Sequence, residues 1–204
     1  MDAIRAFVAI ELPEVIRQKL DDIEKQVQAQ AGEAARKAVR WVHAANMHLT
    51  LKFLGEVSTA NLQVLARMLR SEAQRQPAFD ILLGGLGAFP NVRRPRVIWV
   101  GAEAPAGMLA LQRAIEAETR TLGYPAEERP FSPHLTLGRI SQNARPEEVA
   151  QVARALGEVQ VGEVGRVRVD AVHLFRSDLH PSGAVYTSLY RFQLADNSRQ
   201  PVGE

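Results

Sequence analysis

The chain has 204 residues, 46% of them hydrophobic and 24% charged, with a formal net charge of +2. These proportions are typical of a soluble globular protein, either one large domain or two small lobes. No apolar run approaches the roughly 18 to 20 residues of a membrane span, and the start lacks the basic-then-apolar pattern of a signal peptide. The absence of cysteine excludes disulfides and thiolate metal sites, so we expect a cytoplasmic protein.

The first third of the chain predicts two strands and two helices. A β-rich run over residues 5–12 predicts a strand, and Pro13 suits the first turn of the helix that follows. Apolar residues at helical spacing continue that helix until Gly32. Residues 48–54 predict a strand that ends at Gly55. A helix over 58–69 then follows, with Ser58 as its N-cap.

The middle of the chain holds a glycine-rich stretch between two predicted strands, 79–83 and 97–101. Residues 84–87 read Gly-Gly-Leu-Gly, which suggests a phosphate-binding loop. The stretch lacks the Gly-Lys-Ser/Thr ending of a P-loop, and the pattern G-x-G-x-x-G is absent. We therefore do not assign a phosphate loop here.

The predicted elements end with two successive strands, and the tail from Asp196 (196–204) is polar and expected to fray. Because several strands follow one another directly, we predict an α+β fold with mostly antiparallel sheets. The order of strands and helices shows a rough two-fold repetition, so we expect two lobes packed as a single domain over 1–204. The predicted elements of this part are helices over 105–122 and 146–156, a strand that begins at residue 134, and strands over 167–175 and 185–194.

The tetrapeptide His-Leu-Thr-Leu occurs twice, at 48–51 and at 134–137, which we interpret as internal self-similarity. In a strand, residues i and i+2 point to one face and i+1 and i+3 to the other. Each copy therefore presents a His and a Thr on one surface and two Leu to a core. Facing each other across a cleft, the copies would offer two imidazoles and two hydroxyls to one small anionic substrate.

This combination of groups suits acid–base chemistry at a phosphate. A neutral imidazole accepts a proton from water and an imidazolium donates one to a leaving oxygen, near neutral pH. The hydroxyls of Thr50 and Thr136 can donate to phosphate oxygens and stabilise charge in the transition state. No metal or other cofactor is required for this scheme.

Simpler readings stand beside this one. A single His on a strand is usually a packing or surface residue, and only the duplication favours function. His43, His173 and His180 have no repeated counterpart, and we expect His43 and His180 in loops. A rival hypothesis is a non-catalytic module that captures RNA ends by their terminal phosphate. A His-ligated metal hydrolase is disfavoured, because the sequence lacks a His-x-His or His-Glu-x-x-His cluster.

The sequence resembles the 2H phosphoesterases, specifically the bacterial RNA 2′,3′-cyclic phosphodiesterases once named 2′-5′ RNA ligases. The resemblance implies a bilobal fold with a cleft between pseudo-symmetric halves. It also implies metal-independent hydrolysis of RNA or nucleoside 2′,3′-cyclic phosphates to 2′-phosphomonoesters, with weak reversible 2′-5′ RNA joining. Separately, we expect a monomer with no obligate protein partner. His48 would be the proton donor and His134 the acceptor, although the two motifs are too alike for the residues themselves to assign these roles. The segments that carry the resemblance are residues 5–13, 46–55, 95–101, 131–139 and 174–177.

Three further features are candidates for substrate contacts. Arg139 follows the second motif as a phosphate or RNA contact, but strict alternation from His134 would turn it to the opposite face. A bulge at Gly138 would turn it back, and both orientations stay open. Phe53 holds the equivalent position in the first copy, either in the core or stacked on a base. The basic loop 93–96 either tracks an RNA backbone or is simply solvated.

Overall fold

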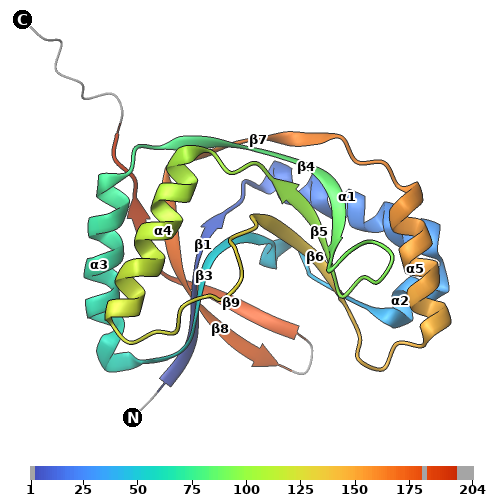
Figure 1. Cartoon of the computed structure of the whole chain (residues 1–204), viewed down its shortest axis with the longest axis horizontal. Coiled ribbons are helices and arrows are strands. Elements are labelled where there is room, and N and C mark those ends of the chain that lie inside the picture. The colour runs from blue at the N-terminus through green and yellow to red at the C-terminus, as the bar shows by residue number, and fades with distance from the viewer. Residues whose placement is uncertain (1–2, 181–182, 197–204) are drawn as a thin grey trace, which may run out of the picture.

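A computed structural model describes residues 3–180 and 183–196, and its strands form one nine-stranded sheet (Figure 1). The strand order is β7-β4-β5-β6-β3-β1-β8-β9, with β2 paired to β6. The strands are β1 Ala3–Glu11, β2 Val39–Trp41, β3 His48–Ser58, β4 Phe79–Phe89, β5 Val97–Ala102, β6 His134–Ile140, β7 Glu163–Val169, β8 Ala171–His180 and β9 Gly183–Gln193. The α-helices are α1 Glu14–Ala31, α2 Glu33–Ala38, α3 Leu62–Arg75, α4 Ala106–Thr121 and α5 Pro146–Glu158. Two 3-10 helices are η1 Ala44–Asn46 and η2 Thr59–Asn61.

The sheet is antiparallel at each of its strand pairs, which confirms the predicted α+β class. It divides into two four-stranded halves, β6-β5-β4-β7 and β3-β1-β8-β9, which join where Leu49 of β3 pairs with Leu135 of β6. The hydrogen bonding is continuous across this junction, so the halves belong to one sheet. The expected separation into two lobes stays a prediction.

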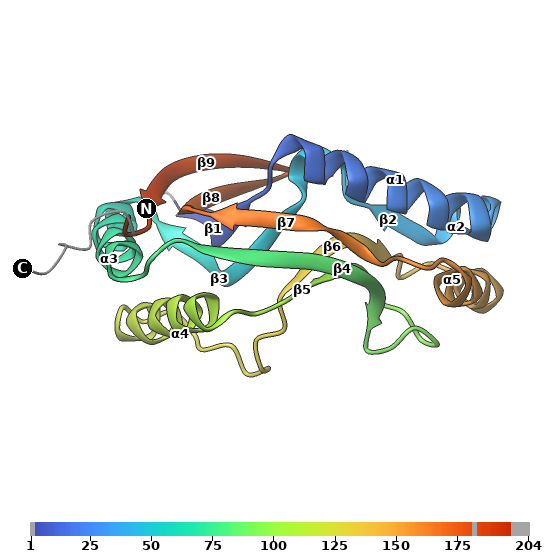
Figure 2. The same cartoon turned by 90° about the horizontal axis from the view of Figure 1, so that it is seen from above.

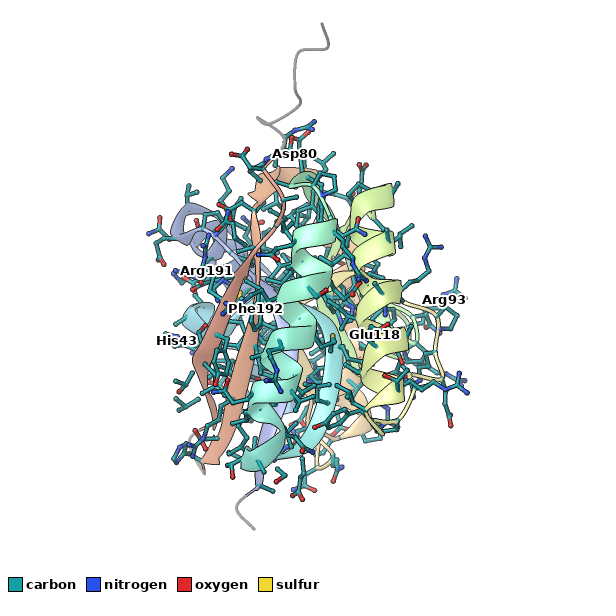
Figure 3. The ribbon with its side chains drawn as sticks, turned by 90° about the vertical axis from the view of Figure 1, so that its left-hand side faces the viewer. His43, Asp80, Arg93, Glu118, Arg191 and Phe192 are labelled. Carbon is teal, nitrogen blue, oxygen red and sulfur yellow. The ribbon has the colours of Figure 1, made fainter. Side chains whose placement is uncertain are left out.

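Helices cover the two ends of the sheet in separate groups. The α3 and α4 helices pack together beside β3, β8 and β9, whereas α1, α2 and α5 form the group at the other end (Figures 1 and 2). Figure 3 looks onto the first group, with Phe192 of β9 next to α3 and Glu118 on α4. None of the helices within the described residues is long and apolar enough to cross a membrane.

Two hydrophobic clusters lie on opposite faces of the sheet. The large cluster packs the helices against the sheet and includes Val8 and Ile10 of β1 together with all four Leu of the repeated motifs. The small cluster contains the alternate β1 residues Phe7 and Ala9, with Phe175 of β8. The helix-covered face is therefore the main core, and the other face is left for a site.

Several predicted boundaries were wrong. The predicted strand 79–83 continues through the glycines to Phe89, because Gly84 pairs with both β5 and β7 and Gly87 pairs with β5. The predicted strand 167–175 is two strands separated at Asp170, and His180 ends β8 rather than lying in a loop. The short α2 and β2 elements were not predicted. Residues 197–204 of the predicted tail lie outside the described residues.

Candidate active site

The two His-Leu-Thr-Leu motifs begin two neighbouring strands. Leu49 pairs with Leu135 in the antiparallel register of β3 and β6. Within the described residues, this is the one partner pair that joins β3 to β6, and it lies between the His and the Thr of each motif. The motifs thus begin adjacent strands of one sheet, and the expected cleft between them stays a prediction.

Both imidazoles are oriented by the same local hydrogen bond. Nδ1 of His48 lies 2.7 Å from the carbonyl oxygen of Asn46, and Nδ1 of His134 lies 2.7 Å from that of Ser132. A carbonyl oxygen only accepts, so Nδ1 carries the hydrogen in each ring. The Nε2 atoms are thereby left for the substrate, as acceptors when the rings are neutral and as donors when they are charged.

Aromatic rings surround the first histidine. The ring of His48 stacks on Phe7 with centroids 4.6 Å apart, and Tyr186 meets it edge-on at 5.0 Å. Phe175 lies behind Phe7, with ring centroids 5.3 Å apart. Burial lowers the pKa of His48 to about 4, against the opposing effect of the Asn46 carbonyl.

The second histidine is less enclosed. Phe89 meets His134 edge-on with centroids 4.9 Å apart. Burial lowers the pKa of His134, and the positive charge of Arg139 lowers it further, while the hydrogen bond to Ser132 opposes both effects. Both rings are therefore neutral at pH 7 in the free protein.

A bulge in β6 decides the orientation of Arg139. Thr136 pairs with Trp99 and Arg139 pairs with Val97, so Leu137 is an additional residue on the β6 side. Trp99 and Val97 are two residues apart in β5 and share a face. Of the two orientations left open by the sequence, the structure gives Arg139 the one on the face of Thr136.

Gly138 is required for this arrangement by its contacts with β2. A Cβ atom at Gly138 would lie 2.7 Å from Cγ1 of Val39 and 2.9 Å from Cε3 of Trp41. A side chain here would therefore push β2 away from β6. The neighbouring β2 residue, Arg40, pairs directly with Arg139 and shares its face.

The same bulge occurs in β3. Thr50 pairs with Ala9 and Phe53 with Phe7, so Leu51 is the additional residue. Phe53 is thereby on the histidine face, and its side chain is 59% exposed. The expectation that Phe53 belongs to the core is wrong, because the bulge reverses the alternation after Thr50.

Sequence reasoning missed the aromatic wall, which Phe7, Phe89, Phe175 and Tyr186 form on four different strands. In β1 both faces are apolar, and this is the signal for a strand buried on both sides. The other three residues come to the site only through long-range pairing. His173 also lies on this face, opposite Ala9, where its Nδ1 is 2.9 Å from Oγ of Ser188.

The basic loop lies between β4 and β5, next to the strand that pairs with Arg139. Arg93, Arg94 and Arg96 are exposed, and within the described residues neither they nor Arg40 and Arg139 form an ion pair. We call these five residues the arginine strip. In the part of the chain that the structure describes, no three His, Asp or Glu side chains converge as a metal site would require.

Comparison with known proteins agrees with this geometry. The sequence model of the 2′-5′ RNA ligase superfamily matches residues 12–181. The chain belongs to the 2′-5′ RNA ligase superfamily. The predicted family resemblance is therefore confirmed, and the superfamily match includes both motifs.

Relatives and solved structures match nearly the whole chain. The RNA 2′,3′-cyclic phosphodiesterase of Methanothermobacter thermautotrophicus is 36% identical over 191 residues, which cover 94% of this chain and 99% of the relative. TT0787 of Thermus thermophilus has a similar fold, with a TM-score of 0.78 and 31% identity over 95% of this chain and 100% of that one. Escherichia coli LigT complexed with 3′-AMP matches with a TM-score of 0.73 and 30% identity, over 95% and 99% of the two chains.

Proposed function

We propose that the protein hydrolyses 2′,3′-cyclic phosphates, at RNA ends or in cyclic nucleotides, to 2′-phosphomonoesters. The names and coverage of its relatives support this reaction. The observation that carries the proposal is the matched pair of imidazoles, each with Nδ1 bonded to a carbonyl and Nε2 free, on adjacent strands. Packing alone does not require the same tautomer at both positions.

In the proposed reaction, Nε2 of His134 takes a proton from water as the water oxygen attacks phosphorus. The bond between phosphorus and the 3′-oxygen breaks, and that oxygen receives the proton held by Nε2 of His48. The acid must be charged before this step, although burial keeps both rings neutral in the free protein. The negative charge of the bound phosphate raises the pKa of the ring, so His48 takes up this proton from solvent when the substrate binds.

Thr50, Thr136 and Arg139 complete the proposed phosphate site. Each hydroxyl lies two residues after its own histidine on the same strand, where it can donate to a non-bridging oxygen. Arg139 adds a cation on the same face, suited to charge that develops in the transition state. Phe53 offers an exposed ring on which a base can stack.

The arginine strip extends the site toward a longer ligand. Its five residues have no carboxylate partner in the described chain, so their charge is available to a phosphate backbone. We therefore propose RNA as the substrate class. With the 5′-hydroxyl of a second RNA in place of water, the same attack would form a 2′-5′ bond, so weak joining stays a prediction. A cytoplasmic location and a monomeric state also stay predictions.

The decisive experiment is product analysis without metal. Purified protein in excess chelator is given adenosine 2′,3′-cyclic phosphate and cyclic-ended oligonucleotides, and the phosphate position is identified by phosphorus NMR. We expect 2′-phosphates only. His48→Ala and His134→Ala should each lower kcat by about 10²- to 10⁴-fold, because each removes one proton-transfer group.

The matched control is His180→Ala, which replaces an exposed histidine at the end of β8 and should leave kcat unchanged. Circular dichroism verifies the fold of every variant. Full activity in the double variant His48→Ala, His134→Ala would refute the acid–base pair. Tight binding of cyclic-ended RNA without turnover would instead support the capture module.

A further inference from the structure

Tyr186 of β9 lies against the imidazole that we propose as the acid. Its ring centroid is 5.0 Å from that of His48 and 5.0 Å from that of Phe7, nearly perpendicular to both. In the sheet order, two strands separate β9 from β3. The contact therefore exists only because the β8–β9 hairpin bends over the histidine face.

The position of β9 is fixed by the residue that also orients His48. Nδ2 of Asn46 donates to the carbonyl oxygen of Ala184 in β9, at 2.7 Å. The carbonyl oxygen of the same Asn46 accepts from Nδ1 of His48. The backbone of β9 and the imidazole of His48 are thus held through a single residue of η1.

The hydroxyl of Tyr186 lies in the field of two cations from other strands. Burial raises the pKa of Tyr186, and the charges of Arg139 on β6 and Arg5 on β1 oppose that rise. Within residues 3–180 and 183–196, neither arginine forms an ion pair, and no hydrogen bond acts on the Tyr186 hydroxyl. A donor hydroxyl that is influenced by two unpaired cations is suited to an anionic oxygen.

We infer that Tyr186 is a further residue of the active site, whose ring holds the imidazole of His48 and whose hydroxyl donates a hydrogen bond to a phosphate oxygen of the substrate. The inference rests on the proposed function and extends it to β9, which carries neither motif. The ring acts as a positioning group through Phe7 and His48. The hydroxyl acts directly on the ligand.

Two substitutions separate these roles. Tyr186→Phe keeps the ring and should lower kcat/KM for adenosine 2′,3′-cyclic phosphate about 10-fold, because a hydrogen bond to a charged group is lost. It should leave the NMR titration of the His48 ring unchanged. Tyr186→Leu should cause the same loss and also shift that titration to higher pH, because the ring that excludes water is gone.

The control is Tyr190→Phe, on the same strand, which removes the hydroxyl that accepts from Nε2 of Gln63 outside the site. It should change neither readout, and His48→Ala assigns the His48 resonance. Wild-type activity in Tyr186→Phe would overturn the role of the hydroxyl. An unmoved His48 titration in Tyr186→Leu would overturn the role of the ring.

Failure of the proposed function gives a different pattern, since the wild-type protein would then turn over no cyclic substrate. The His48 titration still tests the ring in that case, because it needs no turnover. Calorimetric binding of adenosine 2′-phosphate then tests the hydroxyl. Affinity should fall about 10-fold in Tyr186→Phe, and equal affinity would contradict the contact.

Discussion

Each histidine of the pair is oriented by its own chain segment, because the carbonyl that accepts from Nδ1 lies two residues before the ring. The Asn46 and Ser132 carbonyls provide equal bonds of 2.7 Å. The surroundings of the two rings differ, since His48 is enclosed by three aromatic rings and His134 faces one. The two rings therefore share a tautomer, but their different surroundings give them different affinities for a proton.

These environments predict an acidic optimum for kcat/KM, which reports ionisations of the free enzyme. Burial places the pKa of both histidines below 6.5, at about 4 for His48. The bell-shaped profile lies between the two values, so kcat/KM should peak below pH 6.5 and fall as pH rises. The profile of kcat should lie at higher pH, because bound phosphate favours the charged rings.

The measurement is initial rate against substrate concentration from pH 4 to 9 at constant ionic strength. The free energy of unfolding must be measured in parallel. A histidine whose pKa is lowered in the folded state adds its full stabilisation above about pH 6.5, and this stabilisation is lost as pH falls toward the folded pKa. Circular dichroism at each pH separates unfolding from ionisation. A kcat/KM maximum above pH 7 would disprove the proposed effect of burial.

The matching bulges in β3 and β6 bring the second residue after each motif onto the histidine face. Each inserts one residue after the motif's Thr, so Phe53 and Arg139 return to the histidine face. The residue before each of them points to the core and is accommodated differently. Gly138 gives room to β2, whereas Lys52 is buried and forms an ion pair with Glu116 at 2.7 Å.

Gly138→Ala tests the bulge. Its Cβ would approach Val39 and Trp41 within 3.0 Å, so β2 must move and the protein should lose about 1–3 kcal/mol of unfolding free energy. Activity should also fall, because Arg139 pairs with β2. Urea denaturation and kcat/KM measure the two effects.

Gly157→Ala is the matched control, since a Cβ there meets nothing within 4 Å and the residue lies in α5. It should stabilise the protein by about 0.5–1 kcal/mol and leave activity unchanged. If Gly138→Ala were as stable and active as the wild type, the close packing of β2 on β6 would not be needed.

The sequence contained the site's central residues but not its walls. Alternation within His-Leu-Thr-Leu correctly put four leucines in the core and the polar residues on the other face. It could not choose an orientation for Arg139, because the bulge depends on how β2 packs against Gly138. It also could not reveal Tyr186, whose contact with His48 depends on a hairpin that bends across several strands.

The helices and strands that the sequence predicted are those set by local patterns, and the ones it missed depend on distant pairing. Long periodic helices such as α1 and α4 were predicted with small boundary errors, since their pattern is local. The three-residue β2 has too short a pattern to recognise and exists through its pairing with β6. The glycines of β4 indicated a loop by composition, whereas their pairing with β5 and β7 keeps them in a strand.

At the scale of the whole molecule, the arginine strip predicts a preference for RNA chains over cyclic mononucleotides. The variant Arg40→Gln, Arg93→Gln, Arg94→Gln should raise KM for a cyclic-ended oligonucleotide and leave KM for adenosine 2′,3′-cyclic phosphate unchanged. Each lost phosphate contact should also reduce the slope of log affinity against log salt by about 0.7. Kinetics at several salt concentrations measure both quantities.

Arg67→Gln, Arg70→Gln on α3 serves as the comparison, because these exposed arginines lie in the helix group beside β9, away from the arginine strip. That variant should match the wild type on both substrates. Equal oligonucleotide KM values for the strip variant and the wild type would show that the strip does not contact RNA.

The pairing of Leu49 with Leu135 joins segments from opposite halves of the polypeptide. Such distant contacts form late, after shorter loops have closed. During synthesis, the first histidine emerges from the ribosome long before its partner, and the nascent chain has no working centre until β6 has been made and has docked beside β3. A newly made copy therefore gains the proposed activity only after the second motif has folded against the first.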